Sequence, residues 1–416
     1  MIWNDLDLKN IWHPFTPWQA QAPLFIESAS GVHLHAADGR KIIDGISSWW
    51  VNIHGHAHPS IAKAIGEQAA KLEHVIFAGF THEPAIALAT DLLKLLPDQE
   101  KIFFSDNGST AVEAALKLAL QYWKNKGASR TKIVALRGAY HGDTFGAMSV
   151  GERGLFTKPF QDLLFSAEHI PPPSEGSAEA HENVFTEEVA AFIYEPLVQA
   201  ADGMKMHSPE GLDKMVARAK EKNIIVIADE VFTGFFRTGK FTAGEYLTQS
   251  PDLIALSKGV TGGFLPLGVT ACNAKIAEAF RTPDFEKTFF HGHSYTANPL
   301  ACAAANVSLK LLFEKKCQES IALIANLHRD FAQQIGRHEK VKEVRSLGTI
   351  FALEIKTEGG YSASVRNTIY NYFLERDILL RPLGNIIYIL PPYCITREEL
   401  TRIYKAIEDF LNSKMC

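Results

Sequence analysis

Two charged side chains stand at the ends of apolar runs, and their types and spacing indicate covalent chemistry. Asp229 ends the segment "IIVIAD", and Lys258 follows the segment "DLIALS". A carboxylate at the edge of a core needs a cation or a strong donor, and an amine held against apolar residues is pushed toward its neutral, nucleophilic form. The simpler explanations are an ion pair between Asp229 and Arg237, and a lysine that reaches solvent. Together, the two residues favour a carboxylate that holds a protonated ring nitrogen and an amine that forms a Schiff base with an aldehyde.

A tight turn before a helix supplies a third element. Asn107, Gly108 and Ser109 precede the helix-forming segment "TAVEAALKLA", whose free N–H groups and positive dipole end suit a phosphate, although an ordinary capped helix has the same pattern. Anchors for a phosphate, a pyridine nitrogen and an aldehyde together describe pyridoxal 5′-phosphate. A nicotinamide cofactor is disfavoured because no two glycines are separated by a single residue, so the G-x-G-x-x-G motif is absent.

Five short apolar runs predict buried, mainly parallel strands joined by helices. They cover residues 101–105, 132–137, 190–195, 224–229 and 252–257. The carboxyl ends of such strands border one crevice, so we expect the polar residues at these ends to share a site. Those residues are Ser105 with Asp106, Arg137, Glu195, Asp229, and Ser257 with Lys258. The intervening helix is expected to be capped by Ser109 or Thr110 and to end at Gly127.

The pattern changes after about residue 315 to a long helix, a strand region and a polar loop over residues 357–364, which indicates a smaller α+β domain. We therefore expect an α/β protein in three parts. Residues 1–50 contribute to the small domain and the active site, residues 51–315 form the large cofactor-binding domain, and residues 316–416 form the small domain. Residues 170–183, rich in proline and small polar residues, are expected to be a surface connection.

Composition limits the partners. The chain has 416 residues, a formal net charge of −5 and scattered basic residues, so neither nucleic acid nor a membrane surface is expected as a partner. The five cysteines show no C-x-x-C spacing, which favours a reducing cytoplasm and argues against a cysteine zinc site. The N-terminal residues lack the pattern of a signal peptide, and we expect a soluble protein that acts on small molecules.

Four motifs together resemble the class III, fold-type I family of pyridoxal-phosphate aminotransferases. They are "YEPLVQ", "IADEVFTGFFRTGK", "LSKGVTGG" and "HGHSYTANPLACAAA". Further segments resemble the members of that class that act in biotin biosynthesis: "IWHPFTPW", "DGISSWWVNIHGHAHPSI", "GAYHGDTFGAMSV" and "LRPLGNIIYILPPY". The resemblance implies a homodimer with its active site at the subunit interface, 8-amino-7-oxononanoate as the acceptor and adenosylmethionine as the usual donor.

The resemblance also implies roles for individual residues. Lys258, Asp229 and Tyr140 would be catalytic, with Lys258 as the Schiff-base lysine and Asp229 as the partner of the ring nitrogen. The cofactor would be bound by Gly108, Ser109, Tyr140, Asp229, Val231, Lys258, His293 and Ser294, with Ser294 reaching the phosphate in the neighbouring subunit. The substrates would be bound by Phe15, Trp49, Trp50, Tyr140, Asp143, Gly292 and Arg381, with Arg381 pairing with the acceptor carboxylate.

Several alternatives stay open. Trp49 and Trp50 are adjacent, so in an extended segment one would face the site and the other the core. Phe15 stands where the best-known members have tyrosine, which leaves lysine open as an alternative donor, and His293 stands where several members have proline. Another class III transaminase, acting on ω-amino acids such as ornithine or 4-aminobutyrate, is the nearest rival. The spacing of His54, His56 and His58 would put three imidazoles on one strand face, but no second-shell carboxylate pattern accompanies them, so we expect no metal site.

Overall fold

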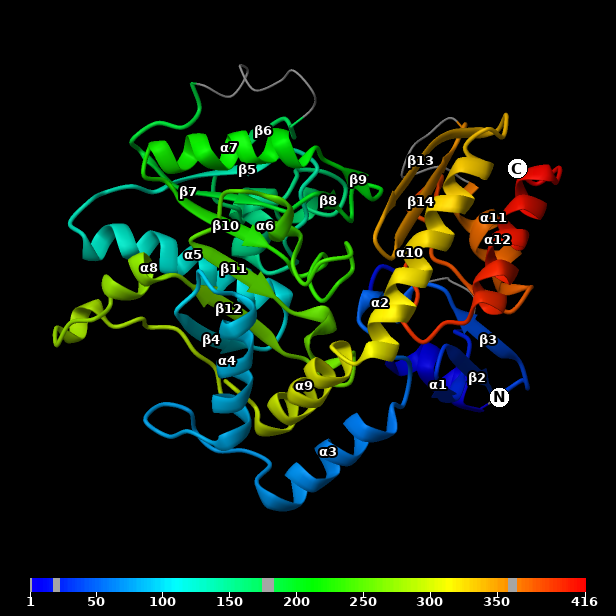
Figure 1. Cartoon of the computed structure of the whole chain (residues 1–416), viewed down its shortest axis with the longest axis horizontal. Helices are drawn as coiled ribbons and strands as arrows, with labels where there is room; N and C mark the ends of the chain where they lie inside the picture. The colour runs from blue at the N-terminus through cyan, green and yellow to red at the C-terminus, as the bar shows by residue number, and fades with distance from the viewer. Residues whose placement is uncertain (1, 18–22, 174–182, 358–364) are drawn as a thin grey trace.

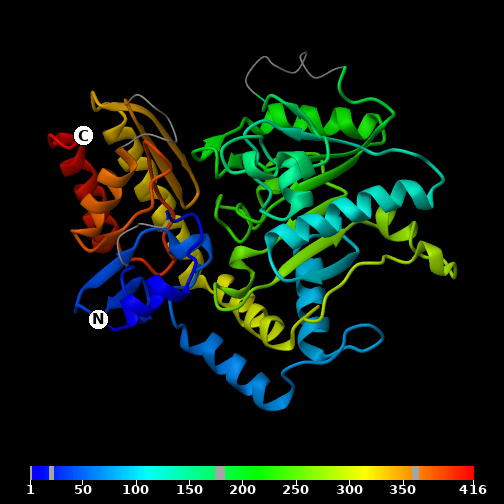
Figure 2. The same cartoon turned by 180° about the vertical axis from the view of Figure 1, so that it is seen from behind.

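The computed structural model describes residues 2–17, 23–173, 183–357 and 365–416. The polar loop expected over residues 357–364 lies outside these ranges apart from Thr357, as does most of the connection expected over residues 170–183. Figure 1 shows a larger body around a central sheet and a smaller body that contains both ends of the chain, and Figure 2 shows the same division from behind.

Among the described residues, the central sheet of the larger body has seven strands in the order β4-β12-β11-β10-β7-β5-β6. The strands are β4 (Lys101–Ser105), β5 (Lys132–Leu136), β6 (Glu168–Ile170), β7 (Val189–Tyr194), β10 (Ile225–Asp229), β11 (Leu253–Leu256) and β12 (Gly268–Cys272). β12 is antiparallel to both of its neighbours, and the other described strands of this sheet run in one direction. The five predicted strands and the mainly parallel α/β sheet are confirmed. The apolar runs did not predict β6 and β12.

Both faces of this sheet are buried, which explains why its strands are apolar throughout. Ile225 and Ile227 of β10 belong to an apolar cluster with helix α5 (Gly108–Asn125), whereas Val226 and Ala228 belong to a second cluster. Successive strand residues point to opposite faces, so each face has its own layer of apolar contacts. A strand buried in this way exposes polar groups only at its ends, which is where the candidate site residues lie.

The remaining elements of the larger body cover the sheet or connect its strands. The helices, besides α5, are α3 (Pro59–Lys71), α4 (Glu83–Leu95), α6 (Phe145–Val150), α7 (Pro209–Glu221), α8 (Ala274–Glu278) and α9 (Pro299–Leu312). Short 3-10 helices are η1 (Lys158–Leu163), η3 (Ala243–Tyr246), η4 (Lys258–Thr261) and η5 (Phe285–Lys287), and β8 (Val198–Gln199) pairs with β9 (Lys205–Met206).

The predicted cap of α5 is wrong by two or three residues. Neither Ser109 nor Thr110 is the N-cap: the side chain of Asn107 accepts a hydrogen bond from the N–H of Thr110, and the Thr110 hydroxyl accepts one from the N–H of Asn107. This reciprocal pair is a capping box with threonine in the third position. The helix ends at Asn125, and Gly127 follows with φ of 77°.

The smaller body combines the N-terminal and C-terminal parts of the chain. One sheet has the order β1-β2-β3-β15 and the other β13-β14-β16. The strands are β1 (Ile26–Ser30), β2 (His33–Ala36), β3 (Lys41–Asp44), β13 (Val341–Leu347), β14 (Ile350–Ile355), β15 (Ile378–Leu379) and β16 (Ile386–Ile389). The helices are α1 (Ile2–Asn10), α2 (Ser47–Trp50), α10 (Lys315–Ile335), α11 (Val365–Leu374) and α12 (Arg397–Asn412). Because β3 pairs with β15, we propose that residues 1–50 and 316–416 form one domain.

Within the part of the chain that the structure describes, no helix is both long enough and apolar enough to cross a bilayer.

Two buried histidines link the stability of the fold to pH. His328 of α10 lies against Tyr404 of α12, with Nδ1 2.7 Å from the Tyr404 hydroxyl, and Nε2 lies 3.2 Å from the carbonyl oxygen of Thr349. Burial lowers the pKa of His328 to about 3. His54, whose Nε2 lies 2.9 Å from the carbonyl oxygen of Ser308, has its pKa lowered to about 4 by burial. Both imidazoles are therefore neutral in the folded protein near pH 7.

We predict that the protein loses stability as the pH falls below 6.5. The unfolded chain binds a proton at each of these histidines near pH 6.5, before the folded chain does, so each removes up to about 1.4 kcal/mol of unfolding free energy per pH unit until its folded pKa is reached. Urea unfolding of wild type and His328→Gln between pH 4.5 and 8 measures this effect. We expect His328→Gln to be less stable than wild type at pH 8 but to show a shallower dependence of the unfolding free energy on pH. His338→Gln, at a partly exposed position, is the control and is expected to keep the wild-type dependence. Parallel curves for His328→Gln and wild type would contradict the assignment.

Candidate active site

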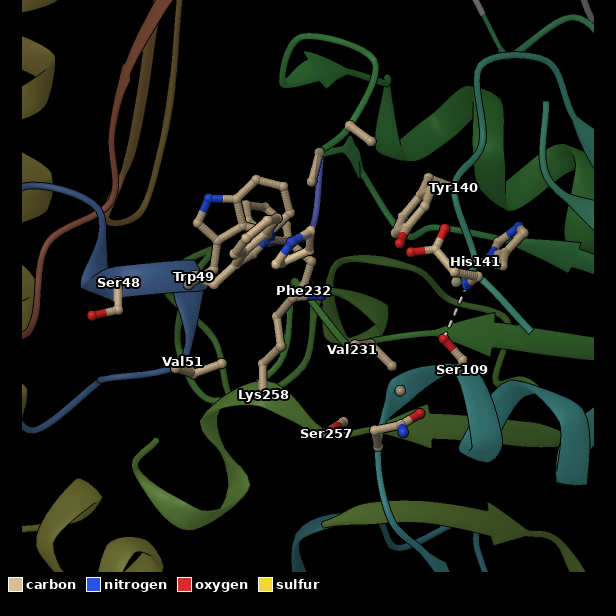
Figure 3. A pocket seen from close by; sticks show the side chains of 18 of the residues that line it. Ser48, Trp49, Val51, Ser109, Tyr140, His141, Val231, Phe232, Ser257 and Lys258 are labelled. Carbon is tan, nitrogen blue, oxygen red and sulfur yellow. Dashed lines mark hydrogen bonds between the residues drawn. The ribbon is translucent and has the colours of Figure 1, made fainter. Parts of the chain in front are cut away.

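The strand ends of the larger body and several segments of the smaller body surround one cavity of about 1260 Å³. Asp106, Glu195, Asp229 and Lys258 line it, as expected for residues that follow parallel strands at one edge. Arg137 does not line it, because its side chain is exposed to solvent beyond β5. Figure 3 shows Lys258 and Val231 in the middle of this cavity, with Tyr140 and Ser109 on one side and Trp49 on the other.

Asp229, at the end of β10, is buried and has a partner that we did not predict. Its Oδ2 lies 2.7 Å from Nδ1 of His141, and its Oδ1 accepts a hydrogen bond of 3.0 Å from the backbone N–H of Val231. The ion pair with Arg237 considered above is wrong: Arg237 donates to the carbonyl oxygens of Pro391 and Trp50. A carboxylate has about four lone-pair positions, so Asp229 keeps capacity for a further donor from the cavity.

His141 is a site residue that the sequence analysis missed. Its ring is buried, and its Nε2 has no hydrogen-bond partner among the described residues, so Asp229 is its one polar anchor there. The sequence did offer one indication, since His141 directly follows the predicted site residue Tyr140 in the segment "AYHGD". Only the fold shows that this loop reaches the end of β10, because the two residues of the pair are 88 positions apart in the chain.

Lys258 begins η4 directly after β11 and lies among groups that affect its amine. Burial lowers the pKa of Lys258, while the negative charges of Asp229 and Glu195 oppose that effect. Its Nζ lies 5.3 Å from the centre of the Trp50 ring. The φ of Lys258 is 24°, a region that residues other than glycine seldom occupy, and such strained backbone concentrates at functional sites. Glu195, buried beside the cavity, has its pKa raised well above its ordinary value by burial and by the charge of Asp229.

The turn before α5 makes close contacts that require glycine. A Cβ atom on Gly108 would lie 2.6 Å from Cγ1 of Val231, so the turn and Val231 line the cavity side by side. Gly142, with φ of 126°, packs against Ser109 so closely that a Cβ would meet the Ser109 hydroxyl. That hydroxyl accepts a hydrogen bond of 3.2 Å from the N–H of Asp143. The turn and the loop that follows β5 are therefore held together at the N-terminus of α5.

Tyr140 and Asp143 lie on that loop, and both line the cavity. Burial and the neighbouring carboxylate of Asp143 raise the pKa of Tyr140, which therefore stays protonated at neutral pH. The backbone N–H of Tyr140 donates to Glu195 over 3.1 Å. The loop is fixed further by Glu113 of α5, whose Oε1 accepts hydrogen bonds from the N–H groups of Gly146 and Ala147 at the start of α6.

The two tryptophans differ from the expectation of an extended segment. Trp49 and Trp50 belong to the short helix α2, where Trp50 has φ of 68°, and both line the cavity. Trp50 is buried and donates a hydrogen bond of 3.0 Å from Nε1 to the Tyr388 hydroxyl, so it serves the core and the cavity wall at once. Trp49 is half-exposed and packs between Phe15, at 5.8 Å between ring centres, and Arg381, whose guanidinium carbon lies 4.5 Å from the ring centre.

Gly292, His293 and Ser294 are not brought to this cavity by their own chain. We call the turn of residues 107–109 before α5 the phosphate turn. His293 lies near this turn, with Nδ1 3.4 Å from Oδ2 of Asp106. The sequence resemblance assigns Ser294 to the neighbouring subunit's site, and its position outside the cavity of its own subunit is compatible with that assignment.

The three histidines of the "HGHAH" segment do not share a strand face, because the segment is a turn that leads into α3. His54 contacts Ser308, and Nε2 of His56 lies 2.8 Å from Oδ2 of Asp44. His58 directly precedes Pro59 at the start of α3. His54 and His56 therefore have separate partners.

The donor set of the cavity fits pyridoxal phosphate. The Asn107 cap leaves the N–H groups of Gly108 and Ser109 without acceptors inside the helix, and these suit a phosphate. Asp229 suits a protonated pyridine nitrogen, and the amine of Lys258 suits an aldehyde. The close approach of Gly108 to Val231 leaves no room for a side chain between the phosphate turn and the cavity floor.

Gly142→Ala is predicted to weaken pyridoxal phosphate binding at least tenfold, because the new Cβ displaces Ser109 and the backbone conformation is strained for alanine. Fluorescence titration of the apoprotein with the cofactor measures the dissociation constant. Gly66→Ala on α3 is the matched control, since nothing lies within 4 Å of a Cβ there. Equal affinities for Gly142→Ala and Gly66→Ala would show that the turn does not bind the phosphate.

Comparisons with known proteins agree with this geometry. The family model "Aminotransferase class-III" matches residues 15–411. An adenosylmethionine-8-amino-7-oxononanoate aminotransferase from Synechococcus elongatus is 49% identical, over 97% of this chain and 98% of that protein. A protein of the same name from Helicobacter pylori is 37% identical, over 98% of this chain and 97% of that protein.

Solved structures show the same fold. The crystal structure of an adenosylmethionine-8-amino-7-oxononanoate aminotransferase from Methanocaldococcus jannaschii superposes with a TM-score of 0.93 at 34% identity, over 99% of this chain and 98% of that chain. A transaminase from the marine bacterium Virgibacillus superposes with a TM-score of 0.91 at 28% identity, over 99% of both chains. The chain therefore belongs to the class III aminotransferases, a family of pyridoxal-phosphate enzymes.

Proposed function

We propose that this aminotransferase converts 8-amino-7-oxononanoate to 7,8-diaminononanoate in biotin biosynthesis, with adenosylmethionine as the amino donor. The observation that carries the proposal is the shared cavity, which is lined by Lys258 and the Asp229–His141 pair from the larger body and by Arg381 from the smaller body. We take the identity of the two substrates from the relatives named above, because their names contain both.

Pyridoxal phosphate, when bound, supplies a carbonyl that condenses with amines and a ring that withdraws electrons from the reacting carbon. Gly108 and Ser109 would hold its phosphate, Asp229 its ring nitrogen and Lys258 its carbonyl carbon, with Val231 and Tyr140 lining the ring. Burial lowers the pKa of the Lys258 amine, which favours the neutral form that a nucleophile and a base need. Nζ of Lys258 would also be placed to accept a proton from the reacting substrate carbon and to donate it again at the carbonyl carbon of the bound group.

Arg381 would bind the acceptor carboxylate, because a guanidinium matches a carboxylate with two parallel hydrogen bonds. Its position over the Trp49 ring fixes the guanidinium plane, and Arg381 forms no ion pair with any described residue. Phe15, Trp49 and Trp50 would line the path of the apolar acceptor chain, and Asp143 would hold Tyr140 or the substrate amine. Gly292 would join them from the neighbouring subunit. Because Phe15 provides no hydroxyl, lysine is retained as the alternative donor.

We also propose a homodimer in the cytoplasm. Ile76, Phe80 and Tyr295 are each more than half exposed, and the Tyr295 ring lies 5.4 Å from the ring of His74, so the segments that carry these residues are neighbours. We call these three residues the apolar patch. Exposed apolar side chains on neighbouring segments are typical of a subunit interface, and Tyr295 directly follows His293 and Ser294 in the chain. The five free thiols are compatible with a reducing compartment.

Lys258→Ala is predicted to lose covalent attachment of the cofactor and to lower kcat by at least about 10⁴, since it lacks both nucleophile and base. Borohydride reduction followed by peptide mass mapping locates the attached cofactor. In the wild type and in the control Lys240→Ala, whose Nζ donates to the carbonyl oxygen of Glu245, the mass is found on the peptide that contains Lys258. Attachment at another lysine would contradict the role of Lys258.

Phe80→Asp is predicted to convert the dimer to a monomer and to weaken cofactor binding, because a charge in the apolar patch is desolvated on association and Ser294 is then no longer supplied to the neighbouring site. Sedimentation velocity measures the first effect and cofactor titration the second. Met415→Asp, at a half-exposed C-terminal position, is the control and stays dimeric. A dimeric Phe80→Asp protein would exclude this patch as the interface.

A dual-substrate assay separates the proposed function from its rival. The purified protein with bound cofactor is mixed with 8-amino-7-oxononanoate and either adenosylmethionine or lysine, and diaminononanoate is measured by mass spectrometry. Product with one of these donors, and none with ornithine or 4-aminobutyrate and 2-oxoglutarate, is the expected result. The reverse pattern would identify an ω-amino acid transaminase.

A further inference from the structure

The backbone of α2 is strained at three of its four residues. Ser47, Ser48 and Trp50 have φ values of 51°, 58° and 68°, a region that residues other than glycine seldom occupy. Such a conformation persists only where the surrounding structure holds it, and it concentrates at functional sites. The segment matters for the cavity, because Trp49 and Trp50 line it and the Trp50 ring lies 5.3 Å from Nζ of Lys258. The groups that hold α2 therefore also set this wall of the cavity.

Asp44, the last residue of β3, anchors the strained segment. Its carboxylate is fully buried, and its Oδ1 accepts a hydrogen bond of 3.1 Å from the N–H of Ile46. Its Oδ2 accepts two hydrogen bonds from Ser48, one of 2.6 Å from the N–H and one of 3.2 Å from the hydroxyl. A buried carboxylate is costly unless donors surround it, so Asp44 holds the turn into α2 only while its set of donors is complete.

His56 supplies a further donor to Asp44, and the function proposed so far gives this histidine no role. Its Nε2 lies 2.8 Å from Oδ2 of Asp44, and its Nδ1 lies 3.1 Å from Nδ2 of Asn52. The amide nitrogen of Asn52 can only donate, so Nδ1 is the acceptor and Nε2 carries the hydrogen that is donated to Asp44. The two contacts thus fix both the tautomer and the orientation of the His56 ring.

Asn52 extends these hydrogen bonds to the segment that carries Lys258. Its Oδ1 packs on Gly263, where φ is 87° and an added Cβ would meet that oxygen. Gly263 follows Lys258 by five residues and lines the same cavity. The chain of contacts from Asp44 through His56 to Asn52 therefore touches both α2 and the loop that follows η4.

We propose that His56 is a positioning residue for the substrate wall formed by Trp49 and Trp50. It completes the donors of Asp44, and Asp44 holds α2 in the strained conformation that places both indoles at the cavity. This role in substrate binding rests on the proposed function, in which the indoles line the path of the acceptor chain. Lys258 is delivered by the central sheet instead, so loss of His56 affects acceptor binding more than the chemical step.

Fluorine nuclear magnetic resonance of protein labelled with 5-fluorotryptophan tests the positioning without any substrate. The chain has six tryptophans, and Trp49→Phe and Trp50→Phe assign the two signals of α2. In His56→Ala both signals shift or broaden, because α2 relaxes from its strained conformation. The signal of Trp123, in α5, stays at its wild-type position. Unchanged α2 signals in His56→Ala would overturn the proposal.

Two further variants separate positioning from a general loss of stability. His56→Gln keeps a side-chain amide that donates to Asp44, and we expect it to retain the wild-type α2 signals. His35→Ala is the matched control, since it removes an imidazole from β2 in the same small sheet, where Nε2 lies 3.2 Å from the Ser30 hydroxyl. It leaves the α2 signals unchanged. A His56→Gln protein with the signals of His56→Ala would exclude the role of the Asp44 hydrogen bond.

Kinetics of the cofactor-loaded protein test the consequence for the substrate. His56→Ala raises the KM for 8-amino-7-oxononanoate at least tenfold and lowers kcat less than threefold, whereas His56→Gln and His35→Ala stay within threefold of wild type in both constants. A loss of folded enzyme alone would lower kcat and leave KM unchanged, and that result overturns the proposal. If the wild type does not aminate the acceptor, the proposed function fails, while the fluorine signals still decide the role of His56 in placing α2.

Discussion

The site depends on one buried carboxylate. Asp229 is carried to the end of a strand whose residues are buried on both faces, and it is anchored there by His141 and by the N–H of Val231. An ionised carboxylate in such a place is costly unless donors surround it, and the described residues supply two. A ligand that brings a protonated nitrogen completes the set. The cavity in front of Asp229 is therefore best matched by a cation on a planar ring.

The other groups are positioned relative to this carboxylate by the sheet edge. β11 lies beside β10 and delivers Lys258, with its strained backbone, next to Asp229. The loop after β5 delivers His141 and Tyr140, and the capped start of α5 delivers the N–H groups for a phosphate. The antiparallel strand β12 lies between β4, which leads into the phosphate turn, and β11, which leads to Lys258. The phosphate turn, Lys258 and Asp229 therefore all border the same cavity.

Sequence patterns predicted five strands of the central sheet and the polar cavity residues that follow them, because both depend on local rules: continuous apolar runs, polar residues at their ends, and a turn before a helix. The resemblance to class III aminotransferases added Trp49, Phe15 and Arg381, which no local rule connects to Lys258. His141 was missed because its contact with Asp229 depends on the tertiary fold. The conformation of Trp50 was also not predictable, since its positive φ and its hydrogen bond to Tyr388 arise from packing between the two ends of the chain.

We propose that Asp229 keeps the ring nitrogen of the bound cofactor protonated. Nuclear magnetic resonance of the protein reconstituted with ¹⁵N-labelled pyridoxal phosphate reports the protonation state of that nitrogen directly. We expect a protonated nitrogen at neutral pH in the wild type and an unprotonated one in Asp229→Asn. An unprotonated nitrogen in the wild type, or the same signal in both proteins, would contradict it.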